Sequence, residues 1–81
     1  MLSSAQKQGL ERTINERIGR ARGVLKSIEG KRLAKEQADI VYQIQTFIKQ
    51  AEEARKIDPL RANNLAERAE VLASDLANRV R

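Results

Sequence analysis

Carboxylates are the side chains with the greatest potential for chemistry in this sequence, because its 81 residues include no cysteine and no histidine. That composition excludes thiol nucleophiles, imidazole acid–base catalysis, zinc fingers and disulfide bonds. Glu52 and Glu53 are adjacent and cannot share one face of a helix. Glu67 and Glu70 lie three residues apart but fall outside the apolar face of their segment, where we expect them to be solvated. With Asp75 standing apart from both pairs, we predict no catalytic site, no metal site and no cofactor.

Basic side chains form the second chemical feature, and they are concentrated toward the start of the chain. Residues 1–35 hold nine basic and three acidic side chains, whereas residues 36–81 hold seven and eight. Several cations on one helical face are the minimum requirement for binding phosphate backbones or anionic lipid. The alternative is a solvated helix face, since Arg12, Glu16 and Arg20 are spaced for ion pairs within a helix. The candidate anion-binding residues are Arg12, Arg20, Arg22, Lys26, Lys31 and Arg32.

Aromatic residues are scarce, which bears on the choice of partner. Proteins that bind single-stranded nucleic acid usually add aromatic stacking platforms, and this chain offers only Tyr42 and Phe47. Nucleic acid is therefore the second choice. Tyr42 falls on the polar side of its segment, and tyrosine is enriched at interface hot spots, so we predict Tyr42 as a contact for a protein partner. Leu60 and Val71 are also expected to point away from the core.

Three segments repeat apolar residues with the period of an α-helix, at residues 4–29, 33–57 and 59–80. The apolar stripe of the first is only about 80° wide, whereas that of the second covers about 140°, which predicts that the second helix touches both neighbours. The face of the third is rich in alanine. No segment alternates with the period of a β-strand, so we predict an all-α fold.

Helices of this length joined by such short connections must run antiparallel. The sequence thus predicts a single helical domain over residues 1–81, an antiparallel three-helix bundle. It leaves open an alternative in which helix 4–29 is splayed from the hairpin of the other two and pairs with a second copy in a dimer. It also leaves open whether these residues are a fragment of a longer protein.

Residues at the predicted helix boundaries are typical start and stop signals. Ser3 and Gln6 form a capping box before the first helix, and Gly30 suits the left-handed residue that follows a helix end. Asp58 and Pro59 supply an N-cap and a first-turn proline for the third helix. Three other glycines lie inside the first helix, where each costs up to about 1 kcal/mol relative to alanine: Gly9, Gly19 and Gly23.

The distribution of apolar residues also bears on compartment. No stretch approaches the roughly 18 apolar residues of a membrane span, and the first residues lack the apolar run of a signal peptide. We therefore expect a soluble chain without a membrane span. Its location stays open between the cytoplasm and the bacterial envelope.

Two alanines carry a likeness to a known family. Ala62 and Ala69 lie seven residues apart on the third predicted helix, after the turn led by Asp58. On these residues, segment 43–76 resembles a helix-turn-helix unit of the tetratricopeptide kind. It is also similar to Ala-rich hairpins in C-terminal regions of uncharacterised bacterial proteins. The resemblance implies a packing or protein-interaction module and supplies no ligand or catalytic residue.

From these features we expect a non-catalytic helical module for protein interaction or scaffolding, not an enzyme. Its partner would be another protein or a second copy of the chain. The alternative function is a binder of anionic surfaces, either nucleic acid or acidic lipid, through the basic first helix.

Overall fold

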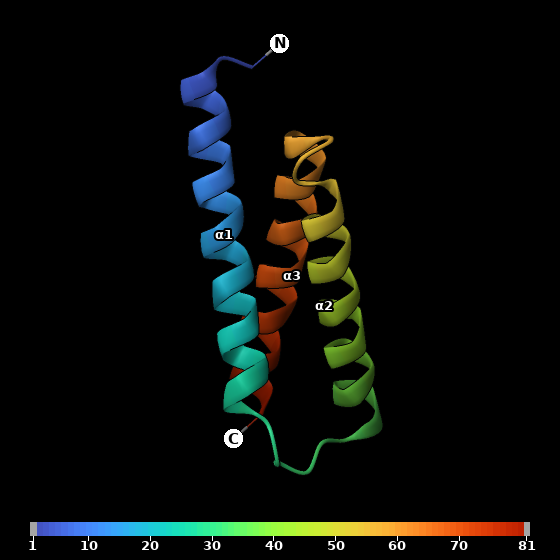
Figure 1. Cartoon of the computed structure of the whole chain (residues 1–81). Helices are drawn as coiled ribbons and strands as arrows, with labels where there is room; N and C mark the ends of the chain where they lie inside the picture. The colour runs from blue at the N-terminus through green and yellow to red at the C-terminus, as the bar shows by residue number, and fades with distance from the viewer. Residues whose placement is uncertain (1, 81) are drawn as a thin grey trace.

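The computed structural model describes residues 2–80, which form three α-helices and, within that range, no β-strand. Helix α1 spans Ser4–Ser27, α2 spans Lys35–Ala54 and α3 spans Pro59–Arg79. In Figure 1 they run down, up and down, each antiparallel to the next, in a bundle with extents of 45 × 16 × 16 Å. The predicted all-α three-helix bundle is confirmed, and α1 packs against α3 instead of standing apart.

The predicted start signals are present as hydrogen bonds. The Ser3 side chain accepts the backbone N–H of Gln6 at 3.1 Å, and the Gln6 side chain accepts the N–H of Ser3 at 2.8 Å. The Asp58 carboxylate accepts the N–H of Arg61 at 3.1 Å, and Pro59 begins α3. These contacts pair backbone donors that the first turn of a helix leaves without a partner.

The helices end slightly earlier than predicted. Residues 28–30 form a turn in which Gly30 adopts φ 79°, the left-handed conformation that glycine enters without steric cost. Residues 55–57 form a second turn, closed by the N–H of Ile57, which donates to the carbonyl of Ala54 at 3.0 Å. The residue before a proline avoids the helical region, so α2 cannot continue through Asp58 and the chain reverses there.

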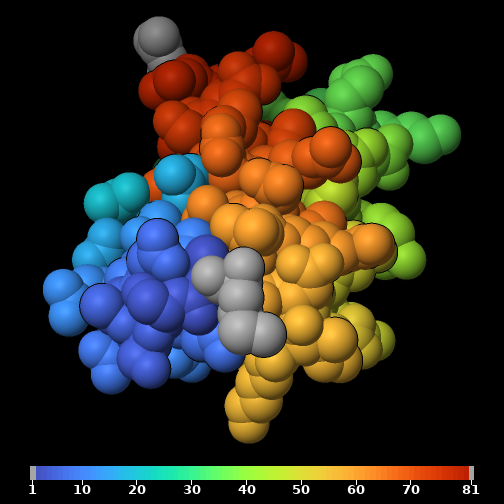
Figure 2. Space-filling view, turned by 90° about the horizontal axis from the view of Figure 1, so that it is seen from above, coloured from blue at the N-terminus to red at the C-terminus, as the bar shows by residue number. Residues whose placement is uncertain are grey.

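Helix α3 is the central helix of the bundle. It packs extensively against both α1 and α2, whereas α1 and α2 touch each other only slightly. Viewed along the bundle, the orange residues of α3 lie between the blue residues of α1 and the green residues of α2 (Figure 2). The buried face of α3 consists of small residues and two leucines: Ala62, Leu65, Ala66, Ala69, Ala73 and Leu76.

The second helix touches both neighbours, as predicted, but its contact with α1 is slight, and α3 is the central helix in its place. The width of the apolar stripe does not indicate which helix is central, because the width depends on the number of apolar positions and not on the size of their side chains. Two neighbours can approach α3 closely because its inward side chains are mostly methyl groups. The larger apolar residues come from the outer helices: Ile14 and Ile18 of α1, and Ile44 and Ile48 of α2, all buried.

Candidate functional site

The six candidate anion-binding residues are all exposed, but the structure does not gather them into one surface. Arg20 binds Glu70 at 2.6 Å, and Arg22 binds Glu52 at 2.7 Å. Arg12 and Lys26 lie 14 residues apart along α1, a distance of about 21 Å at the rise of an α-helix. The last two candidates, Lys31 and Arg32, belong to the loop after α1. The other four candidates form no ion pair within residues 2–80: Arg12, Lys26, Lys31 and Arg32.

The solvent exposure of Glu70 was predicted wrongly from the sequence. This residue was expected to be solvated, but its side chain is only 21% exposed and it lies between two arginines of α1. Arg17 approaches Glu70 at 3.1 Å and Glu67 at 3.8 Å. The hydrogen bond and the negative charge of Glu70 raise the pKa of Arg20 above its ordinary value. This cluster joins α1 to α3 along one edge of their contact.

A smaller polar contact joins α1 to α2 on the other edge. The guanidinium of Arg55 donates to the side-chain oxygen of Asn15 and lies 3.8 Å from Glu11. With the Arg22–Glu52 pair, it ties together two helices that share few apolar contacts. The α1 charges that suggested a ligand are thus partly used to hold the bundle.

Replacing Glu70 with glutamine is expected to lower the urea midpoint of unfolding. Glutamine keeps the shape of the side chain but removes the charge that Arg17 and Arg20 share. The loss should shrink in part at about 1 M NaCl, because added salt weakens the attraction between charges that are partly exposed to solvent, as Arg20 and Glu70 are. Glu53→Gln is the control, since Glu53 is exposed and forms no ion pair among residues 2–80. An equal loss at low and high salt would show that the hydrogen bonds accepted by Glu70, and not its charge, account for the effect.

Neither a metal site nor a membrane span is present in the described part of the chain. Among residues 2–80, no three acidic side chains come together in an arrangement that could hold a metal ion. Over the same residues, none of the helices combines the length and apolar character needed to cross a lipid bilayer.

Tyr42 projects from the outer face of α2, as the sequence predicted, and its side chain is 70% exposed. It borders a shallow depression together with Thr46, Lys49 and Glu53. The lining is polar apart from the tyrosine ring. Leu60 and Val71 are also exposed, as predicted, and both lie on α3.

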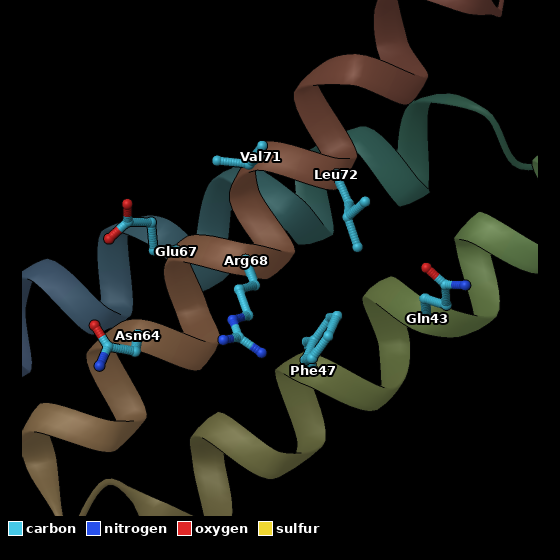
Figure 3. A pocket seen from close by; sticks show the side chains of 7 residues that line it. All are labelled: Gln43, Phe47, Asn64, Glu67, Arg68, Val71 and Leu72. Atoms are coloured by element: carbon cyan, nitrogen blue, oxygen red, sulfur yellow. The ribbon is translucent and has the colours of Figure 1, made fainter.

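A groove between α2 and α3 collects apolar side chains at the surface. This groove, the α2/α3 groove, has a volume of about 520 Å³, and α1 packs on the other side of the hairpin. In Figure 3, Phe47 of α2 and Leu72 of α3 point toward each other, while the side chain of Arg68 extends into the space beside Phe47. The lining residues are Gln43, Phe47, Asn64, Glu67, Arg68, Val71 and Leu72.

The sequence pattern contained a signal for this groove that was not used. Phe47 and Leu72 sit at the edges of their apolar stripes, and Val71 was recognised as pointing away from the core. Edge residues of two adjacent antiparallel helices meet in the groove between them, so combining the two helical patterns would have placed all three together. That combination requires knowing which helices are neighbours and on which side.

A second hollow of about 400 Å³ lies between the same two helices, nearer the turn that joins them. Ile57, which is 88% exposed, stands at its edge, and Leu65 lies at its base. The lining residues are Gln50, Glu53, Ala54, Ile57, Asp58, Arg61 and Leu65. Two of the four exposed large apolar residues within residues 2–80, Ile57 and Val71, therefore border hollows between α2 and α3.

No protein-family model, curated protein or solved structure matches the chain.

Proposed function

We propose that this protein is a non-catalytic helical interaction module and that the α2/α3 groove receives a segment of a protein partner. The observation that carries the proposal is the exposed apolar lining of the groove, in which Val71 is 59% exposed beside half-buried Phe47 and Leu72. One third of the residues of this chain are charged, so a cluster of apolar residues at its surface stands out. Such a cluster is typical of a site that is covered by another molecule.

Burial of this lining would supply the free energy of binding. Each square ångström of apolar surface removed from water contributes roughly 25 cal/mol, so covering the exposed apolar surface of this lining contributes about 2 kcal/mol before the entropic cost of association, and the apolar surface of the partner adds its own share. Apolar residues that line a groove between two helices are typically bound by the apolar face of a third helix. The likeness of segment 43–76 to a tetratricopeptide hairpin agrees with this role.

The rest of the bundle supports the groove as a rigid surface. Helix α1 covers the opposite side of α3, where it is held by buried Ile14 and Ile18 and by the ion pairs of Glu70. A preformed groove loses little conformational entropy when a ligand binds. In this proposal α1 is a structural support, and α2 and α3 supply the contacts.

Site-specific photocrosslinking in the cells that make the protein tests the proposal. A photoreactive phenylalanine analogue at position 71 should give discrete adducts with one protein partner, since this position borders the groove. The same analogue at position 74 is the control, because Ser74 is exposed on α3 but does not line the groove. Identical adducts at the two positions, or no adduct at position 71, would contradict the proposal.

A further inference from the structure

The linings of the α2/α3 groove and of the second hollow together carry two arginines and three carboxylates. Arg61 and Arg68 lie seven residues apart on α3, so they occupy the same side of the helix about 10.5 Å apart. Both are exposed, and among residues 2–80 neither takes part in an ion pair. By contrast, Arg17, Arg20 and Arg22 of α1 all bind carboxylates of neighbouring helices.

Two of the three carboxylates of the lining already have other contacts, and within residues 2–80 none of the three forms an ion pair with Arg61 or Arg68. The Asp58 carboxylate caps α3 by accepting the N–H of Arg61. Glu67 approaches Arg17 of α1 at 3.8 Å, and in Figure 3 its carboxylate points away from the groove. On the α2 side, Gln43 and Gln50 are uncharged. Glu53 is the one remaining carboxylate of the lining.

From this arrangement we infer that the groove binds an acidic amphipathic helix of a protein partner. This inference rests on the proposed function and adds the chemistry of the ligand. The partner helix places apolar residues against Phe47, Leu72 and Val71, and two carboxylates seven residues apart face Arg61 and Arg68. Arginine binds a carboxylate through two parallel N–H donors, which fixes the position of the partner along the groove.

The fold already contains one example of this type of contact. Helix α1 packs on α3 through isoleucines, and Glu70 of α3 pairs with two arginines at the edge of that contact. The partner helix uses the same combination on the other side of α3, with the charges exchanged. The lining spans residues 58–72 of α3, about 21 Å, which corresponds to a partner helix of roughly four turns.

Selection from a helical peptide library tests the inference. The library consists of four-turn peptides with a varied apolar stripe and with glutamate, glutamine or lysine at two flanking positions seven residues apart. Wild-type protein should enrich glutamate at both positions. An R61E/R68E variant should enrich lysine instead and should bind the wild-type selected peptides about tenfold more weakly.

A variant with the same change in net charge provides the matched control. R12E/K26E reverses two exposed cations of α1, and it should select the same glutamate peptides as the wild type. The thermal melt of each variant, followed by circular dichroism, checks that the fold is retained. Peptides that bind with no preference for glutamate would overturn the inference and leave the groove as an interaction site. Absence of any peptide whose binding is lost in Val71→Arg would overturn both the inference and the proposed function.

Discussion

Replacing Ala69 with leucine is expected to lower the free energy of unfolding by about 3 kcal/mol, near the upper end of the usual cost of overpacking a core. Ala69 is fully buried on α3, the helix that packs against both α1 and α2. Leucine adds three carbon atoms where the neighbouring helices approach the backbone of α3. The bundle must then either separate its helices or force side chains out of their preferred rotamers.

Urea denaturation followed by circular dichroism measures this effect. The control is Ala77→Leu, which makes the same chemical change on the same helix at an exposed position. That substitution should change the free energy of unfolding by less than about 0.5 kcal/mol. If the two variants were equally stable, α3 could not be the closely packed centre of the bundle, and the second helix would again be a candidate for that place.

The number of helices and the starting points of α1 and α3 could be predicted from local signals. A capping box such as Ser3 with Gln6, or an N-cap followed by proline such as Asp58–Pro59, depends only on neighbouring residues. Gly30 was placed correctly for the same reason, because helices commonly end at a residue with positive φ and glycine adopts that conformation without steric cost. These features do not depend on how the helices pack.

The central helix could not be predicted, because it depends on the packing of the whole bundle. The wide apolar arc of the second helix was interpreted as contact with two neighbours, and α2 does touch both, but it is α3 that packs extensively against two helices, through its alanines. The position of Glu70 was wrong for a related reason. A helical projection places Glu70 outside the apolar face, yet Arg17 and Arg20 of α1 cover it once α1 lies beside α3.

The residues of the candidate site also divide into those that can be predicted from one helix alone and those that depend on how the helices pack. Tyr42 and Val71 were correctly placed on the surface, since each lies opposite the apolar stripe of its own helix. The groove that contains Val71 needs residues from two helices, and its charge depends on which arginines are already paired. In sequence, Arg20 and Arg68 are equivalent surface cations. In the structure Arg20 binds Glu70, whereas Arg68 extends into the groove (Figure 3).

Replacing the three glycines inside α1 with alanine is expected to stabilise the protein. Gly9, Gly19 and Gly23 are exposed, and a Cβ atom built on each meets no other atom within 4 Å. The substitutions therefore cause no clash, and each lowers the backbone entropy of the unfolded chain by restricting its conformations. At about 0.5–1 kcal/mol per position, the triple variant should gain about 1.5–3 kcal/mol. For a domain of this size, that corresponds to a rise in Tm of roughly 10–20 °C.

Gly30→Ala is the matched control, and the opposite sign is expected. A Cβ atom at this position also meets no neighbour, but φ is 79°, a conformation that costs a residue with a side chain about 1 kcal/mol. Differential scanning calorimetry of the two variants would separate the effect of backbone conformation from that of available space. If the triple variant did not gain stability, the outer face of α1 would have to be in contact with another chain, and the alanine methyl groups would disturb that contact. A Tm that varies with protein concentration for the wild type but not for the triple variant would identify the other chain as a second copy.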